Sequence, residues 1–299
     1  MIKVENISKN YGEVKALKGI SFEVKEGQLY GLIGPDGAGK TSLFRILTTL
    51  LLPSEGSATL KGFDTVKEYK KIRKIIGYMP ERFSLYMDLT VEENLNFFAT
   101  VFNTTVEENY HLIEDIYKML EPFKHRRAGA LSGGMKQKLA LSCALIHKPD
   151  ILLLDEPTTG VDPVSRKEFW EMLKKLQKTG LTTLVSTPFM DDAELCDEVA
   201  LIQDGNILKI DTPANIAESY PYKLWKVVTD NNYQTLKAFD RYEKKIAAFS
   251  FGHSIHLSTG EEVSSKEIEK FLVNNKIDVQ SVMPIKASIE DVFMELMKD

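Results

Sequence analysis

Eight residues near the N-terminus have the types and spacing of a loop that binds phosphate groups, namely Gly34, Pro35, Asp36, Gly37, Ala38, Gly39, Lys40 and Thr41. Glycines let backbone N–H groups converge on phosphate oxygens without obstruction by a Cβ atom. Lys40 can reach the β- and γ-phosphates of a nucleotide, and the Thr41 hydroxyl can bind Mg²⁺. A strand pattern precedes the loop and a helix pattern begins at Lys40, so a phosphate would meet the N-terminus of a helix. This context favours phosphate binding over a simple glycine-rich turn.

Two acidic residues, Asp155 and Glu156, follow the apolar run 151–154. The run predicts a buried parallel strand whose carboxyl end lies beside the phosphate loop. Asp155 is the expected partner of Mg²⁺, because hard cations prefer oxygen ligands. Glu156 is the residue expected to orient and deprotonate an attacking water. The simpler interpretation, two acids at the end of a strand, becomes weaker once the phosphate loop is taken into account.

The elements that must position these residues alternate between strands and helices, which predicts a parallel or mixed sheet covered on both faces. The helix that begins at Lys40 is expected to carry Leu43, Ile46, Leu47 and Leu50 at helical spacing. The other expected helices span 66–76, 90–123, a segment after 132, 163–178 and 191–195. The expected strands span 2–4, 20–24, 28–33, 57–60, 151–154, 182–186 and 198–203.

The composition changes after Tyr220-Pro221, which predicts a domain over 1–221 and a small C-terminal α/β domain over 222–299. The order of strands and helices in this tail resembles a split β-α-β unit. Its last helix would carry four apolar residues on one face, which would either pack within the domain or contact a second copy. These residues are Ile289, Val292, Phe293 and Leu296.

The composition limits the class of protein. The chain has 299 residues, of which 43% are hydrophobic and 27% charged, as in ordinary globular proteins. The net charge of -5 argues against non-specific binding of nucleic acid. Cys143 and Cys196 lack metal-ligand spacing and are expected to be reduced thiols. We expect neither a signal peptide nor a membrane-spanning helix, so that any membrane role would require a partner.

A further motif precedes Asp155 and consists of Leu131, Ser132, Gly133, Gly134 and Met135, followed by Lys136 and Gln137. With this motif the chain resembles the ATP-binding-cassette (ABC) family. The resemblance implies a P-loop cassette with a mixed sheet and a helical subdomain over about 83–145. It also implies that ATP and Mg²⁺ bind, and that the motif faces ATP held by a second protomer, so that two chains enclose two nucleotides.

Other matches to the family follow in the expected order. Tyr11 matches the aromatic residue that stacks on adenine, and Ser42 extends the ATP-binding loop. Asp162 lies in the segment 159–163, which matches the loop that links the two sites of the dimer. The segment 77–81 matches the loop beside the helical subdomain that touches the membrane partner, and Glu81 in it is a candidate Mg²⁺ ligand.

The motif 131–135 and the segment 287–293 look like those of ATPases from ABC-2-type exporters. The implied function is an ATP-hydrolysing subunit that powers such an exporter by nucleotide-driven dimer closure. Its partners would be an ABC-2-type permease and a second copy of itself or a homologous subunit, and it would lie on the cytoplasmic face of the membrane. A soluble ABC-family ATPase and a slow ATP switch remain as alternatives, and the transported substrate is not encoded in these motifs.

Two residues depart from the pattern of the family. Glu81 stands where the family usually has glutamine, and Pro188 stands where it usually has histidine. Proline has neither a ring N–H nor a backbone N–H to donate to the γ-phosphate. The sequence therefore predicts an ATP hydrolase that is slow.

Overall fold

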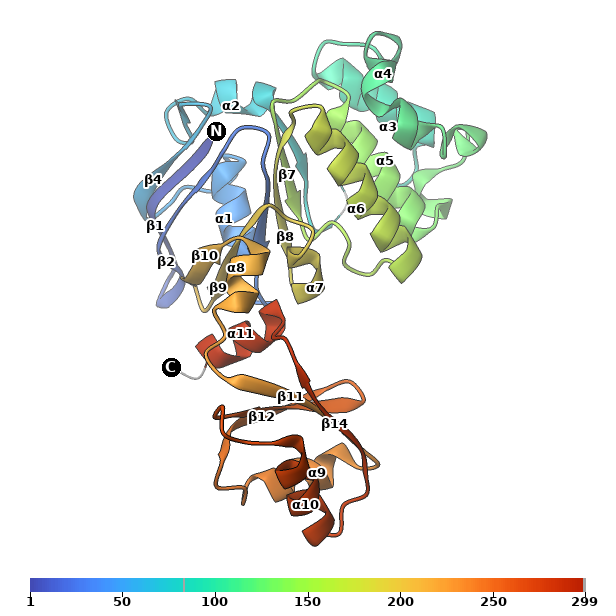
Figure 1. Cartoon of the computed structure of the whole chain (residues 1–299). Helices are drawn as coiled ribbons and strands as arrows, with labels where there is room; N and C mark the ends of the chain where they lie inside the picture. Colours follow the sequence, from blue (N-terminus) through green and yellow to red (C-terminus); the bar gives the residue numbers. More distant parts are fainter. Residues whose placement is uncertain (83, 298–299) are drawn as a thin grey trace. The chain divides into compact units, whose positions relative to one another are not determined.

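The computed structural model describes residues 1–82 and 84–297 and divides into two compact units, Met1–Pro213 and Ala214–Asp299. Residue 83, at which the helical subdomain was expected to begin, lies outside the described residues. The first unit contains two sheets with helices around them, and the second contains one sheet (Figure 1).

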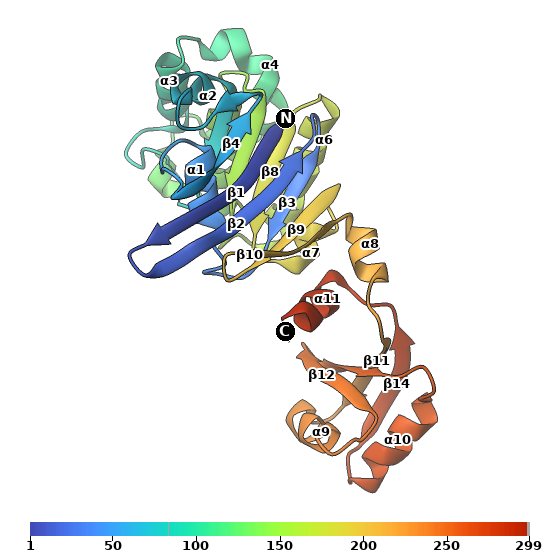
Figure 2. The same cartoon turned by 90° about the vertical axis from the view of Figure 1, so that its left-hand side faces the viewer.

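The first sheet of unit one is antiparallel and forms a cover over the central sheet. Apolar residues alternate with polar ones in β1, where Ile2, Val4 and Ile7 are buried. Figure 2 shows β1, β2 and β4 in front of β3 and β8. In spatial order the sheet consists of β2 (Val14–Val24), β1 (Ile2–Tyr11), β4 (Glu55–Leu60) and β5 (Phe63–Asp64).

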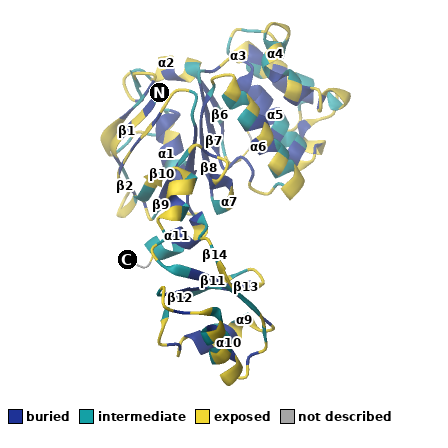
Figure 3. Ribbon diagram, in the orientation of Figure 1, coloured by how far each residue is buried: buried dark blue, intermediate teal, exposed yellow. Residues whose placement is uncertain are grey.

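The central sheet of unit one has a parallel core. All residues of β7 and β8 are buried (Figure 3), as expected for strands that are covered on both faces. Five strands run parallel, so their carboxyl ends meet at one edge, and only β10 is antiparallel. The spatial order is β10 (Asn206–Asp211), β9 (Glu198–Gln203), β3 (Leu29–Ile33), β8 (Thr182–Thr187), β7 (Ile151–Asp155) and β6 (Ile76–Met79).

Helix α1 (Lys40–Leu47) lies between the two sheets and shares one hydrophobic core with them. The expectation that Leu50 belongs to this helix is wrong. The helix ends at Leu47, where the Thr48 hydroxyl donates to the carbonyl oxygen of Phe44. Thr49 then takes a positive φ of 63°, and Leu50 is exposed.

Several helices of the first unit begin at residues whose side chains accept a hydrogen bond from the backbone of the first turn. Thr90 and Glu93 form the expected capping box at the start of α3. The expected single helical region 90–123 is in fact interrupted, because a second box of Thr105 and Glu108 starts a new helix. The helices are α2 (Tyr69–Ile75), α3 (Val91–Val101), α4 (Val106–Tyr117), η1 (Glu121–Phe123), η2 (Ala128–Ala130), α5 (Gly133–Leu145), α6 (Pro163–Lys178) and α7 (Met190–Ala193).

The second unit is a four-stranded antiparallel sheet of βαββαβ order, with a core formed with α9 and α10. On α11 the side chains of Ile289, Val292 and Phe293 are buried in the single chain, and that of Leu296 is half-buried. The elements of this part are α8 (Pro213–Glu218), β11 (Lys223–Thr229), α9 (Asn232–Phe239), β12 (Lys245–Phe251), β13 (Ser254–Thr259), α10 (Ser265–Asn274), β14 (Val279–Ile285) and α11 (Ile289–Leu296).

Within the described residues, no helix combines the length and apolar character needed to cross a membrane.

Candidate functional site

The phosphate loop connects β3 to α1 at the carboxyl edge of the central sheet. Gly39, the residue before α1, has a φ of 105°, which a residue with a Cβ atom rarely adopts. A Cβ atom at Gly34 would collide with the carbonyl oxygen of Ile202. The loop can therefore take this path only with glycine at these two positions.

Lys40, the first residue of α1, is buried and points its ammonium group back into the loop. Its Nζ atom donates to the carbonyl oxygens of Gly34 at 2.7 Å and Pro35 at 2.9 Å. It also lies 3.0 Å from Oε1 of Glu156. The expected phosphate-binding lysine and the expected catalytic acid are thus in direct contact.

Asp155 ends β7 inside the sheet and is fully buried. Its Oδ1 atom accepts a hydrogen bond from the Ser186 hydroxyl at 2.7 Å, whereas its buried Oδ2 atom has no hydrogen-bond partner in good geometry among the described residues. Burial raises the pKa of Asp155, and the hydroxyl groups of Ser186 and Thr41 act against this rise. A buried carboxylate oxygen beside a hydroxyl is an oxygen donor set that suits Mg²⁺.

Glu156 follows β7 with a positive φ of 50°, an uncommon conformation for glutamate. Its backbone N–H donates to Ser186, to the carbonyl oxygen at 3.1 Å and to the hydroxyl at 2.9 Å. Its Oε2 atom accepts a hydrogen bond from the Thr159 hydroxyl at 3.2 Å. These contacts hold the carboxylate at the mouth of the phosphate loop.

Tyr11 and Glu81 reach the surroundings of this site. The Tyr11 hydroxyl lies 3.3 Å from the Ser42 hydroxyl, and the Nζ atom of Lys9 lies 5.4 Å from the Tyr11 ring centroid. Glu81 is exposed after β6, and its charge adds to the rise of the Asp155 pKa that burial causes. Asp36 is exposed in the loop itself.

The signature motif 131–135 does not join this site in the single chain. Ser132 caps α5 and accepts a hydrogen bond from the Met135 N–H at 3.3 Å. Helix α5 packs against β6, on the face of the sheet opposite to α1. Asp162 caps the neighbouring helix α6 by accepting from the N–H groups of Val164 and Ser165.

The structure adds the hydroxyl groups of Ser186 and Thr159 to the site, where the sequence analysis did not place them. Ser186 binds Asp155, the last residue of β7, and Glu156, which follows it, and Thr159 binds Glu156. Beside Pro188, the Thr187 hydroxyl donates to Asp192 at 2.8 Å and accepts from the Phe189 N–H at 3.1 Å. The sequence shows hydroxyl residues near Glu156 and at the end of the neighbouring strand. It does not show which of these hydroxyl groups face the two acidic residues.

The chain is similar to several known proteins. The family model described as ABC transporter matches residues 17–159. A Nod factor export ATP-binding protein I of Burkholderia orbicola is 39% identical over 221 residues, which cover 73% of each chain. The linearmycin resistance ATP-binding protein LnrL of Bacillus subtilis is 36% identical over 219 residues, which cover 72% of this chain and 70% of that protein.

A longer relative covers almost the whole chain. The probable multidrug ABC transporter ATP-binding protein YbhF of Escherichia coli is 37% identical over 286 residues, which cover 94% of this chain. The chain spans about half the length of that relative, 49%.

Solved structures show the same cassette fold. The cassette MJ0796, in a dimeric post-hydrolysis state with ADP and Pi, matches 71% of this chain and 98% of its own, with a TM-score of 0.64 and 29% identity. An ATP-binding subunit of an ABC transporter matches 74% of this chain and 93% of its own, with a TM-score of 0.67 and 26% identity. The chain therefore belongs to the family of ABC transporter ATP-binding proteins.

Proposed function

We propose that this protein binds Mg-ATP at the phosphate loop, hydrolyses it, and thereby powers an exporter whose membrane part is an ABC-2-type permease. The observation that carries the proposal is the contact of Lys40 with Glu156 at the sheet edge where Asp155 also ends its strand. The relative named for Nod factor export supports the direction of transport.

Different residues of the site would bind the phosphates, the Mg²⁺ ion and the adenine ring of ATP. Lys40 would exchange its carbonyl partners for the β- and γ-phosphates, because a phosphate anion attracts an ammonium group more strongly than a carbonyl does. Thr41 and Asp155, with Glu81 nearby, would hold Mg²⁺. When bound, Mg²⁺ neutralises charge on the phosphate oxygens. Tyr11, beside Ser42, offers its ring to adenine.

Glu156 would act as the general base of hydrolysis. It takes a proton from a water whose oxygen attacks the γ-phosphorus, and the bond from that phosphorus to the bridging oxygen breaks as ADP leaves. The Thr159 hydroxyl and the contacts of the Glu156 N–H to Ser186 fix the direction of the carboxylate. A positioned base of this kind contributes roughly 10²–10⁴-fold to a rate.

Hydrolysis is expected to be slow because the loop after β8 supplies no donor at Pro188. Its neighbours do not replace the missing group: the Ser186 hydroxyl donates to Asp155, and the Thr187 hydroxyl donates to Asp192. One missing donor to transition-state charge costs on the order of 10²–10³ in rate. Glu81 adds a negative charge near the nucleotide.

A second protomer would complete each site. The segment Leu131–Met135 lies at the N-terminus of α5, where free N–H groups favour a phosphate, yet it is separated from the phosphate loop of the same chain by the central sheet. We propose that a second copy, or a homologous subunit, offers this segment to ATP across the dimer. Asp162, at the start of α6, would lie near the same interface.

The permease would dock on a groove of about 450 Å³ in unit one, beside the loop that carries Glu81. Apolar side chains from β6, α3 and α5 line it, together with the ring of Tyr78. We propose that the chain binds the cytoplasmic face of the membrane through this partner, which would also determine the substrate. No nucleic acid is proposed as a partner.

Affinity purification of the tagged protein from detergent-solubilised membranes tests the proposal. We expect one multi-span membrane protein to copurify and to stimulate ATP hydrolysis that Glu156→Gln abolishes. Copurification should weaken on substitution of Phe98, in the groove, by Glu, but not on substitution of the exposed Lys167 by Glu. Hydrolysis by a protein that no membrane protein accompanies would instead identify a soluble ATPase or switch.

A further inference from the structure

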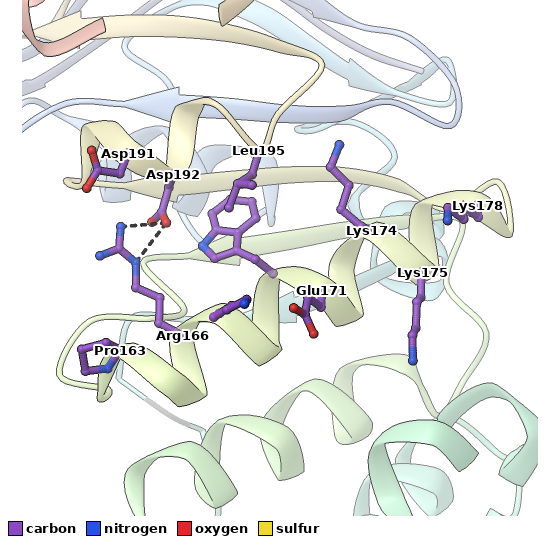
Figure 4. Close-up of a pocket in the computed structure, with 11 residues that line it drawn as sticks. Pro163, Arg166, Glu171, Lys174, Lys175, Lys178, Asp191, Asp192 and Leu195 are labelled. Atoms are coloured by element: carbon purple, nitrogen blue, oxygen red, sulfur yellow. Dashed lines mark hydrogen bonds and ion pairs between the residues drawn. The ribbon is translucent and has the colours of Figure 1, made fainter. Parts of the chain in front are cut away.

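The carboxylate of Asp192 anchors the loop that follows β8. Asp192 is only 2% exposed. Its Oδ1 atom accepts hydrogen bonds from Nε of Arg166 at 3.0 Å and from Nη2 at 2.8 Å, as the dashed lines in Figure 4 show. Its Oδ2 atom accepts from the Thr187 hydroxyl at 2.8 Å. Both oxygens are therefore occupied, one by Arg166 of α6 and one by Thr187, the last residue of β8.

Both neighbours of Pro188 take part in this arrangement. The Thr187 hydroxyl accepts a hydrogen bond from the Phe189 N–H, which closes the backbone around the proline. The Arg166 guanidinium lies 4.1 Å from the centroid of the Phe189 ring, within the range of a cation–π contact. Arg166 thus contacts Phe189 and Asp192, which both follow the rigid Pro188, and through Asp192 it is linked to Thr187, which precedes the proline.

These contacts form a closed path that begins and ends at Glu156. In one direction, Glu156 accepts from Thr159, and the chain continues into α6, which carries Arg166. In the other direction, the Glu156 N–H donates to Ser186, which directly precedes Thr187. Thr187 donates to Asp192, and Asp192 accepts from Arg166, so the two directions meet at Asp192.

We propose that Arg166 is a positioning residue for ATP hydrolysis, which acts through Asp192 to hold the end of β8 and, with it, Ser186 and Glu156. The proposal rests on hydrolysis at Glu156, as argued under the proposed function. Without Arg166 the buried Asp192 would lack its cation. Burial already raises the pKa of Asp192, while Thr187 and Arg166 oppose that rise. The carboxylate would then either take up a proton or turn toward solvent, and the loop would lose its anchor.

The test compares Arg166→Gln with Lys167→Gln, a matched control at the next position of α6, where the side chain is exposed. Single-turnover hydrolysis, the ATP dissociation constant and the thermal midpoint are measured for each. We expect Arg166→Gln to lower the hydrolysis rate roughly 10- to 100-fold, since small displacements of catalytic groups have effects of this size. The ATP dissociation constant should stay within about a factor of two, because in the described part of the chain the Arg166 side chain contacts Asp192 and Phe189 and not the phosphate loop. Lys167→Gln should match the wild type in all three.

A second set of variants tests whether the two residues act as one unit. Asp192→Asn should lower the rate as Arg166→Gln does, and the double variant should lose much less than the product of the two effects. Arg166→Lys retains the charge but not the two-pronged geometry, so it should restore part of the rate. These comparisons also cover the case in which Arg166→Gln folds poorly.

The outcomes separate this inference from the function on which it rests. If the wild type hydrolyses ATP and Arg166→Gln does so at the same rate, the positioning role is wrong and the function stands. If Arg166→Gln and Arg166→Lys lose ATP affinity and thermal stability in proportion to rate, Arg166 is structural only. If the wild type shows no hydrolysis that depends on Glu156, the proposed function itself fails.

Discussion

The Nζ atom of Lys40 lies 3.0 Å from Oε1 of Glu156, and both side chains are almost completely buried. The expected phosphate-binding group and the expected base therefore neutralise each other within one chain. An approaching γ-phosphate would compete with Glu156 for the Lys40 ammonium group. ATP binding would therefore free the Glu156 carboxylate to accept a proton from water.

The first prediction concerns the stability of this pair. Lys40→Met should lower the free energy of unfolding by about 3 to 5 kcal/mol, because it leaves a buried carboxylate without its cation. Adding Glu156→Gln should recover much of that loss, since a neutral amide replaces the unpaired charge. Urea unfolding of the two variants checks this. A double variant less stable than Lys40→Met would contradict the direct pairing.

Ser186 gives the second prediction, because one hydroxyl serves both Asp155 and the Glu156 N–H. Ser186→Ala should cost about 1 to 3 kcal/mol of stability, as buried polar groups lose their partner, and should weaken Mg²⁺-dependent ATP hydrolysis. Thr183→Val on the same strand is the matched control. The Thr183 hydroxyl has no hydrogen-bond partner among the described residues, so this change should be nearly neutral. If Ser186→Ala and Thr183→Val had equal effects on stability and hydrolysis, Ser186 would have no special role in the site.

The sequence predicted the elements that carry strong local signals. The run 151–154 predicted a strand because its uninterrupted apolar residues indicate burial on both faces. The segment 163–178 predicted a helix because its residues show helical spacing and a capped start. The strand β10 was missed, although Asp204-Gly205 before it is a hairpin signal, and both residues take a positive φ.

For the site, too, the sequence predicted only the residues that belong to a local motif. The phosphate loop, Asp155 and Glu156 form motifs along the chain, so they could be named from spacing alone. The Arg166–Asp192 pair could not, because its members lie 26 residues apart and meet only when α6 packs beside the loop after β8. Side-chain pairs of this kind are set by tertiary packing, which no local pattern encodes.

The third prediction tests the departure at Pro188. Pro188→His should raise the single-turnover rate by up to about 10²-fold, because an imidazole N–H could then donate to the γ-phosphate. Pro188→Ala is the control, since it relaxes the backbone without adding a ring donor. Glu81→Gln in the His background should raise the rate further. Identical rates for the wild type and Pro188→His would show that the missing donor does not limit hydrolysis.

The fourth prediction is a pH dependence in the second unit. The His256 Nδ1 atom lies 2.7 Å from Oδ1 of Asp291. Burial alone would raise the pKa of Asp291, but hydrogen bonds from His256 and Ser288 outweigh it and hold the pKa below its usual value. A depressed carboxylate pKa stabilises the fold above the unfolded pKa of about 4, and this stability is lost as the pH falls through the folded pKa.

Asp291→Asn should therefore cost about 1 to 3 kcal/mol at pH 7 and much less near pH 2. Trp225 lies in the core of the second unit, so its fluorescence in a Trp170→Phe background reports on this unit. A cost that does not change between the two pH values would mean that Asp291 contributes by packing rather than by charge.

The most direct test of the account is one comparison of wild type and Glu156→Gln under saturating Mg-ATP, with hydrolysis and molecular mass measured on the same samples. The account predicts that the wild type converts ATP to ADP and phosphate, while Glu156→Gln retains bound ATP, loses hydrolysis by about 10²-fold or more, and elutes as a dimer. A Glu156→Gln protein that still hydrolyses ATP at the wild-type rate, or that stays monomeric with ATP bound, would contradict it.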